Sequence, residues 1–407
     1  MLTTPFHDRL AAWSDTQLWE HWAGYLSAIK YQHSETVEYF AMRDAVGVFD
    51  TTPLFKYRIA GAHAVEAMRP VFVRDVADCR VGGAQYNLMC NDAGYVLEDC
   101  VLLRTETDEL WITTAERNLR YLSGLLGARA DVEECRDRWG MLAVQGRHSL
   151  SVLSQLSGDV AALGYFGVAR TTIAGVEVMV SRTGFTGDRG YEVWAPAAGS
   201  VAVFDAIFEA GAGHNILPAG ARALGMTRLE AGLVLLGTDF EPARFAWTDA
   251  QRETPHELGL GWMVPASSDR AYIGRDAIEK ERAEGRTRWK TTGLIVDAAA
   301  YEAAFNAAGL MAPKEGVYRT GTMSLYDRDF NSDSAAAYVG YVTSFMFSPL
   351  LKRHIGLAKI PPGRQESGSE VFLELVVSHR PHYVRAEVAK LPFYNPPRKT
   401  ASHEESP

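Results

Sequence analysis

One fourteen-residue segment combines the residue types of a binding loop with a single carboxylate. It runs from Ser181 to Trp194, and three glycines fall within seven of its positions. Glycines at this density indicate a backbone that approaches another group closely or adopts positive φ angles. Glu192 follows them inside an apolar strand, where a buried carboxylate needs a partner. That partner is either a neighbouring arginine, as in an ordinary tight hairpin, or the polar edge of a bound ligand.

An adjacent pair of acids, Glu98 and Asp99, forms a second candidate site. The pair lies in residues 85–114, which read as a three-stranded meander with its first turn at residues 91–94. Because successive side chains of a strand point to opposite faces, only one of the two carboxylates can face a pocket. Neighbouring acids can split their pKa values and keep one protonated, which suits protonation of a departing amine, thiol or alkoxide. The alternative is an ordinary exposed acidic pair.

The elements that would position these residues indicate an α+β fold. Leucines at helical spacing predict a helix that begins near Leu119, and the same period predicts helices over 148–156, 201–210 and 219–235. Strands and helices come in runs instead of strict alternation. After about residue 290, strand-like runs separated by Gly, Pro and Ser turns predict a closing all-β domain. Those runs are residues 292–296, 337–343, 355–360, 371–377 and 384–388.

The composition is that of an ordinary globular protein with more than one domain. The 407 residues exceed what one core supports, and 47% are apolar. A net charge of −9 without clustered Lys and Arg argues against a nucleic-acid partner, so an anionic cofactor would need a few local cations. No run of about 18 apolar residues occurs and the first residues lack a signal-peptide pattern, which predicts a cytoplasmic protein with no membrane segment.

The cysteines give no sign of a metal site. Their spacing includes no C-x-x-C pair and no partnered His cluster, so we expect reduced core thiols and no metal. The four are Cys79, Cys90, Cys100 and Cys135.

The Ser181–Trp194 segment resembles the R-T-G-Y-T-G-E-x-G-[FY]-E signature of the T-protein (aminomethyltransferase) family of tetrahydrofolate-dependent one-carbon transferases. Similar matches extend over nearly the whole chain. They comprise residues 39–50, 221–232, 257–262, 342–344, 347–349 and 390–394. The resemblance implies a T-protein-like multidomain arrangement with a C-terminal all-β barrel domain, and tetrahydrofolate as the cofactor.

The resemblance also assigns roles to two residues of the cofactor site. The last Glu of the family signature holds the pterin ring, which makes Glu192 the leading anchor. A pterin edge offers an amino group and a ring N–H side by side, and one carboxylate can accept both. Arg222 stands where the family's helix contacts the folate, although an ion pair with Glu230 or Asp249 would also explain it.

Three aromatic residues match the family's pocket by position: Tyr86, Tyr165 and Phe185. A flat heterocycle gains from stacking on such side chains, although each could equally belong to the core. Phe185 replaces the usual Tyr and therefore lacks its hydroxyl.

The acidic pair resembles the family's G-G-x-[IL]-D-D motif, whose first Asp is the catalytic carboxylate beside the folate N5. Glu98 occupies that position here and is one methylene longer than Asp. We therefore expect Glu98 to face the pocket as the catalytic residue, with Asp99 as the alternative.

The resemblance is weaker in the half that would bind the one-carbon donor. Extra residues lie within 240–252, and Arg244, Phe245 and Trp247 could either reshape the mouth of the site or form a packed surface loop. We therefore predict transfer of a methyl group from a small O-, S- or N-methylated donor to N5 of tetrahydrofolate, as in the family's demethylase branches. The alternatives are an aminomethyltransferase that acts on a lipoylated carrier protein, and a folate-binding protein without turnover.

The resemblance and the element pattern together predict a domain division. We expect residues 1–50 and 140–277 to form the folate-binding α+β domain, with residues 51–139 inserted into it as a second α+β domain. Residues 290–397 should form the barrel, and residues 398–407 a flexible tail.

Overall fold

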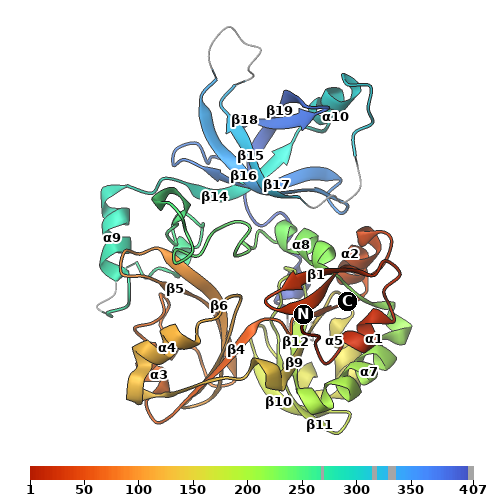
Figure 1. Ribbon diagram of the computed structural model, residues 1–407, viewed down its shortest axis with the longest axis vertical. Helices are drawn as coiled ribbons and strands as arrows, with labels where there is room; N and C mark the ends of the chain where they lie inside the picture. The colour runs from red at the N-terminus through yellow and green to blue at the C-terminus, as the bar shows by residue number, and fades with distance from the viewer. Residues whose placement is uncertain (267–269, 314–318, 329–335, 402–407) are drawn as a thin grey trace.

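The computed structural model describes residues 1–266, 270–313, 319–328 and 336–401, and these residues form two large open sheets, one two-stranded sheet and one closed barrel. Figure 1 places the barrel above the two sheets, which lie next to each other. This arrangement of helices and strands confirms the predicted mixed fold with a C-terminal barrel.

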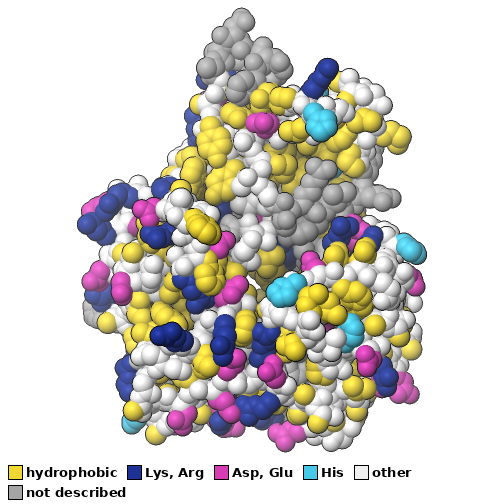
Figure 2. Space-filling view, viewed as in Figure 1, with side chains coloured by type: hydrophobic (Ala, Val, Ile, Leu, Met, Phe, Trp, Pro, Cys, Tyr) yellow, Lys and Arg dark blue, Asp and Glu magenta, His cyan; other side chains and the backbone are white. Residues whose placement is uncertain are grey.

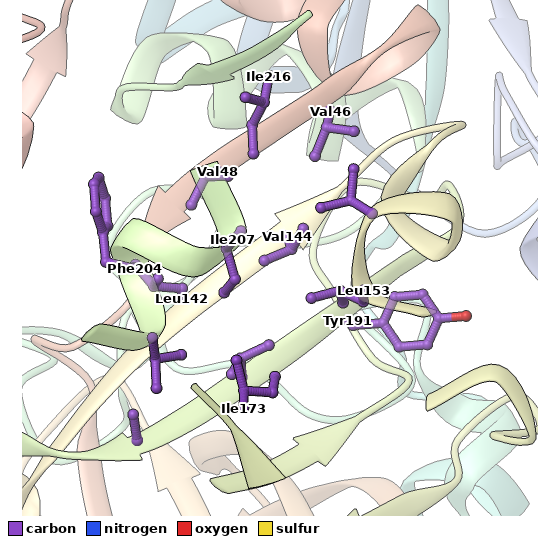
Figure 3. Close-up of a cluster of buried hydrophobic side chains, with 14 of the residues drawn as sticks. Val46, Val48, Leu142, Val144, Leu153, Ile173, Tyr191, Phe204, Ile207 and Ile216 are labelled. Atoms are coloured by element: carbon purple, nitrogen blue, oxygen red, sulfur yellow. The ribbon is translucent and has the colours of Figure 1, made fainter. Parts of the chain in front are cut away.

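The first sheet carries the Ser181–Trp194 segment. Its order is β10 (Val168–Ile173), β11 (Val176–Ser181), β12 (Gly190–Pro196), β9 (Trp139–Gln145), β3 (Val46–Asp50) and β13 (Ile216–Pro218). Alternate strand residues are apolar, so one face is buried against α5 (Ser149–Leu156) and α7 (Ser200–Gly211). Figure 3 shows this core, in which Val46 and Val48 of β3 lie near Leu142 and Val144 of β9.

Shorter helices and a hairpin complete the first unit. Those that precede β3 are α1 (His7–Ala11), the hairpin of β1 (Leu18–Trp22) with β2 (Tyr25–Lys30), and α2 (Glu35–Asp44). Helix α6 (Gly158–Ala161) follows α5.

The second sheet contains the predicted meander and the acidic pair. Its order is β5 (Gly83–Cys90), β6 (Val96–Glu106), β7 (Glu109–Thr114), β4 (Phe55–Ala60) and β8 (Asp131–Glu134). Helices α3 (Ala64–Met68) and α4 (Leu119–Leu126) supply apolar side chains to the core on one of its faces. The helix predicted from the leucine spacing is therefore present as α4.

The barrel closes because β14 (Lys290–Val296) pairs with both β17 (Arg353–Ile360) and β19 (Arg380–Ala389). Strands β16 (Tyr338–Ser348), β15 (Arg319–Tyr326) and β18 (Glu370–Val377) complete the circle, and α10 (Ala298–Asn306) packs on β19. The sequence analysis did not predict β15, whose residues alternate less clearly between apolar and polar.

Residues 234–278 pack on the second sheet instead of the first. Val234, Phe240, Leu258 and Ile278, the last in α9 (Arg275–Glu284), share a buried cluster with Leu88 of β5. This packing differs from the expectation that residues 140–277 form one unit with residues 1–50. We propose a boundary near residue 233 instead.

The start of the expected flexible tail is held in place. Arg398 donates two 2.7 Å hydrogen bonds to the Asp188 carboxylate, and Arg182 donates to the backbone oxygens of Lys399 and Ala401. These bonds fix residues 398–401 against the glycine-rich loop. Residues 402–407 lie outside the described part of the chain.

Helix α8 (Ala221–Glu230) lies between the first unit and the barrel, where it contacts α2, β2 and β16. It ends before the predicted residue 235, because Gly232 adopts a φ of +67° that turns the chain away. Arg228 of α8 is fully buried and pairs with Asp239, which also accepts hydrogen bonds from Thr343 and Ser344 of β16. This network joins the helix to the barrel.

Replacing Arg228 by Ala should destabilise the protein strongly. The substitution leaves the Asp239 carboxylate buried without its cation, a change that costs about 3–5 kcal/mol. We expect a clearly lower midpoint of urea denaturation. The matched control is Arg9→Ala, which breaks the exposed Arg9–Asp205 pair and should cost less than about 1 kcal/mol. Equal shifts for the two variants would contradict this assignment.

Candidate active site

A cavity of about 1590 Å³ lies where the two sheets and the barrel meet. Its wall includes Phe49 and Glu192 of the first sheet, Asp99 of the second sheet and Lys290 of the barrel. Pockets for small ligands commonly measure about 300–1,000 Å³. The cavity therefore has room for two ligands that react with each other.

Glu192 faces this cavity from β12. Its strand neighbours are Ser181 on β11 and Ala143 on β9, so the side chain is set in the middle of the sheet. The Thr183 hydroxyl donates to Glu192 Oε2, and Glu192 makes no salt bridge with any residue of the described chain. Burial raises the pKa of Glu192, whereas the Thr183 hydrogen bond and the charge of Lys56 lower it. The sequence left open an ion pair between Glu192 and a neighbouring arginine, and the structure shows no such pair among the described residues.

Lys56 of β4 is a residue of this region that the sequence analysis missed. It is fully buried, and its Nζ donates to the backbone oxygens of Thr52 at 2.8 Å and Leu54 at 3.0 Å. Burial lowers the pKa of Lys56 to about 7. A single lysine inside an apolar strand carries no motif that could have identified it.

The glycines before Glu192 allow close packing of the loop. A Cβ atom at Gly184 or Gly190 would lie 2.1 Å from Gln145 Oε1, and one at Gly187 would lie 2.3 Å from the Ala231 Cβ. Gly187 also has a φ of +71°. The predicted close approach is therefore confirmed, and the groups approached are Gln145 and Ala231 of the protein itself.

The structure places Asp99, not Glu98, in the cavity wall. The Tyr86 hydroxyl donates to Asp99 Oδ2 at 2.9 Å, and both residues line the cavity. The expectation that Glu98 faces the pocket is wrong, because β6 presents alternate side chains to opposite faces and Asp99 takes the cavity side. Burial raises the pKa of Asp99 to about 6, while the Tyr86 hydrogen bond lowers it.

Glu98 is fully buried on the other face of β6 and binds a network of donors. It accepts hydrogen bonds from the backbone N–H groups of Ala115 and Glu116, from the Asn118 amide, and from Arg244 at 3.3 Å. Burial and the nearby Asp99 charge raise the pKa of Glu98 to about 8, and these partners lower it. Glu98 thus holds the chain beyond β7, where Ala115 lines the cavity.

The loop at residues 240–252 supplies Arg244 to that network and does not line the cavity. Its Ala243 is buried in the core of the second sheet and donates a backbone hydrogen bond to Val96 of β6. Trp247 is 92% exposed and Phe245 is 48% exposed. The structure therefore supports a packed surface loop over a loop that reshapes the mouth of the site.

The three predicted aromatic residues all line the cavity. Tyr165 is 39% exposed and lies edge-on to Phe166, with ring centroids 4.8 Å apart. Phe185 is half-buried, and Tyr86 points its hydroxyl at Asp99 as described above. The cavity therefore has flat apolar walls near both carboxylates.

Arg222 lines the cavity from the first turn of α8 and forms a 3.7 Å ion pair with Glu35. Its partner is neither Glu230 nor Asp249, because Glu230 binds Arg43 and Tyr39 inside the protein. The Arg222 side chain is 45% exposed, so part of its guanidinium faces solvent.

The charge of the cavity wall differs from that of the whole chain. Seven Lys or Arg residues line the cavity against four Asp or Glu residues, although the net charge of the chain is −9. On the face shown in Figure 2, basic and acidic side chains are interspersed. The cavity is thus a local site of positive charge that suits an anionic ligand.

The described residues contain neither a candidate metal-binding group nor a candidate membrane-spanning helix. In residues 1–266, 270–313, 319–328 and 336–401, no three His, Cys, Asp or Glu side chains are grouped to hold a metal ion. Within the same ranges, no helix has both the length and the apolar character needed to span a membrane.

Replacing Arg244 by Gln should destabilise the protein more at pH 9 than at pH 6. Because the folded pKa of Glu98 is raised to about 8, its contribution to stability is full at low pH and is lost as pH rises through that value. Removing Arg244 raises this pKa further, so the additional loss at pH 9 should be about 1 kcal/mol, equivalent to about one pKa unit. Urea denaturation at both pH values measures the difference.

The control for this experiment is Arg252→Gln, which breaks the exposed pair with Asp249 in the same loop. That variant should lose the same small amount of stability at both pH values. A pH-independent effect of Arg244→Gln would contradict the proposed coupling to Glu98.

Comparison with known proteins agrees with this geometry. Residues 3–268 match the family described as GCVT N-terminal domain, and residues 306–395 match the glycine cleavage T-protein C-terminal barrel domain. An aminomethyltransferase of Saccharopolyspora erythraea is 30% identical over 397 residues, which cover 96% of this chain and 97% of the relative. A trimethylamine-oxide aldolase of Ruegeria pomeroyi is also 30% identical, over 97% of this chain and 47% of that protein.

The fold is similar to that of a solved relative. The crystal structure of glycine cleavage system aminomethyltransferase T from Bartonella henselae superposes with a TM-score of 0.79 at 22% identity, and the match covers 97% of this chain and 98% of that one. The chain therefore belongs to the glycine cleavage T-protein family, and it is an enzyme that transfers one-carbon units with tetrahydrofolate.

Proposed function

We propose that this enzyme moves a methyl group from a small O-, S- or N-methylated donor to N5 of tetrahydrofolate. The observation that carries the proposal is the presence of two separate carboxylates, Glu192 and Asp99, in one cavity. Glu192 serves to bind the coenzyme, and Asp99 serves to move a proton during the transfer.

The cavity fits a reduced pterin at Glu192. A half-buried carboxylate that accepts from the Thr183 hydroxyl and forms no salt bridge among the described residues retains acceptor capacity for two parallel N–H groups. Phe185 and Tyr165 supply flat apolar surface in the same wall, and Arg222 supplies positive charge. These residues would hold tetrahydrofolate, which when bound supplies N5 as the methyl acceptor.

Asp99 is suited to exchange a proton close to neutral pH. In the transfer, the bond between the methyl carbon and the donor heteroatom breaks, the heteroatom keeps the electron pair, and a new carbon–nitrogen bond forms. A departing alkoxide, thiolate or amine takes a proton, and N5 gives one up. A carboxyl group with a pKa of about 6, oriented by Tyr86, can perform either proton transfer.

The donor side of the proposal is supported by cavity size and by one relative. The cavity of about 1590 Å³ leaves space for a second small molecule next to the coenzyme. The similar protein of Ruegeria pomeroyi is named for trimethylamine oxide, a small methylated compound. The name of this relative favours a free donor over a carrier-bound one, and the cavity volume is sufficient for such a donor.

An aminomethyltransferase is the second candidate, because several relatives at 29–30% identity carry that name. In that case the one-carbon unit would arrive on the lipoyl arm of a carrier protein and would leave as methylene-tetrahydrofolate. The product therefore separates the two candidates.

Incubation with tetrahydrofolate and a panel of methoxyaromatic acids, sulfonium compounds and methylamines tests the proposal. We expect 5-methyltetrahydrofolate to form in equal amount to one demethylated donor, measured by liquid chromatography with mass detection. Formation of methylene-tetrahydrofolate with an aminomethylated lipoyl carrier, and of no product with any free donor, would refute the demethylase function.

Substitutions at the two carboxylates should impair different steps, coenzyme binding at Glu192 and turnover at Asp99. Glu192→Gln should weaken tetrahydrofolate binding by about 30-fold or more, because one oxygen acceptor becomes a donor that opposes the pterin N–H. Asp99→Asn should leave binding within about threefold and should lower turnover by about 10²–10⁴-fold. Calorimetric titration and single-turnover assays measure the two quantities.

The matched control is Glu177→Gln, an exposed acid on β11 of the same sheet, which should change neither quantity. If Glu192→Gln binds the coenzyme as tightly as the wild type, the assignment of the anchor fails. If Asp99→Asn turns over normally, the assignment of the proton-transfer group fails.

A further inference from the structure

Arg74 is a charged side chain in the cavity wall that receives the charge of Asp78 at a distance and makes no direct carboxylate contact among the described residues. It is half-buried, and one guanidinium nitrogen donates to the backbone oxygen of Tyr86 at 2.8 Å. It forms no salt bridge within the described part of the chain, whereas Arg222 pairs with Glu35 and Arg228 pairs with Asp239. Burial lowers the pKa of Arg74, as expected for a cation that lacks a strong partner.

Trp262 packs beside Arg74, and both side chains line the cavity. The Arg74 Cζ lies 5.5 Å from the centroid of the Trp262 ring, and the Trp262 side chain lines the cavity although 63% of it is exposed. Stacking on an aromatic face leaves the edge N–H groups of a guanidinium directed outward, where they can meet a planar anion. Arg74 and Trp262 therefore present a cation and an apolar face side by side to a ligand in the cavity.

Arg74 is connected to Asp99, the residue beside which the proposed donor would react. A single residue, Tyr86, connects it to Asp99, because the Tyr86 backbone oxygen accepts from Arg74 and the Tyr86 hydroxyl donates to Asp99. Glu192 belongs to a different sheet. A molecule that reacts beside Asp99 can thus reach Arg74 with its far end.

We infer that Arg74 binds a carboxylate of the methylated donor while Trp262 packs against the donor's carbon skeleton. A guanidinium binds a carboxylate through two parallel hydrogen bonds, which would orient the methylated end toward Asp99. The inference rests on the proposed function and narrows its donor to a methylated carboxylic acid. The glutamate carboxylates of tetrahydrofolate are the other source of the same chemistry, and the experiment distinguishes the two sources.

The test compares carboxylic acids with their neutral amides. Calorimetric titrations of the protein with tetrahydrofolate present would use 4-methoxybenzoate against 4-methoxybenzamide, and N,N-dimethylglycine against its amide. We expect at least one acid to bind about tenfold or more tightly than its amide. Arg74→Gln should remove that preference, and Arg74→Lys should retain part of it. The control Arg80→Gln, an exposed arginine of the same segment, should retain it fully.

Four results would overturn the inference. The first three are equal binding of acid and amide to the wild type, equal weakening of both by Arg74→Gln, and no binding of either acid. In the fourth, Arg74→Gln weakens the binding of tetrahydrofolate but not that of tetrahydropteroate, which lacks the glutamate. That result would assign Arg74 to the coenzyme's glutamate.

Failure of the proposed function gives a different pattern. In that case the acids would bind with the Arg74-dependent preference, yet no 5-methyltetrahydrofolate would form from them. The binding readout therefore tests the role of Arg74 separately from turnover.

Discussion

The burial of one carboxylate without a cation partner is the constraint on which the site depends. Taking the Glu192 carboxylate out of water is costly, and burial accordingly raises its pKa. The Thr183 hydroxyl and the charge of buried Lys56 offset part of this cost. A neutralising arginine would offset more of it, but it would also occupy the positions at which a ligand's N–H groups can bind. The site thus gives up some stability to retain a free acceptor.

The three units of the fold maintain the cavity through buried polar contacts between them. Glu230 of α8, which pairs with Arg43 of α2, accepts a hydrogen bond from Ser348 of the barrel, Arg228 binds Asp239 and Ser344, and Glu253 pairs with Lys359 of the barrel. Each pair is almost completely buried, so removal of one partner would leave an isolated charge in the interior. Directional contacts of this kind specify how the units dock, whereas apolar packing alone would permit small sliding motions.

Features that depend on the spacing of apolar residues or on a sequence motif could be predicted from the sequence. The meander, helix α4 and the barrel strands other than β15 follow from local patterns, and the position of Glu192 in the cavity wall follows from the family signature. Which of Glu98 and Asp99 lines the cavity could not be predicted, because a shift of one residue in a strand turns every side chain to the other face. Family position favoured Glu98, but β6 in fact directs Asp99 to the cavity.

The remaining differences depend on contacts between residues far apart in the chain. The Arg244–Glu98 pair joins segments that no local pattern connects, and the charge of Lys56 acts on Glu192 of another sheet. The same holds for residues 398–401, which are polar and would fray if Asp188 and Arg182 did not bind them. Propensity describes isolated segments, and such tertiary contacts override it.

The most direct test of the account is a crystal structure of the protein with tetrahydrofolate bound. The account predicts that the pterin amino group and the adjacent ring N–H lie within hydrogen-bonding distance of the two Glu192 carboxylate oxygens, with Asp99 in the wall facing N5. A coenzyme seated elsewhere in the cavity, or a Glu192 carboxylate paired with a lysine or arginine, would contradict it.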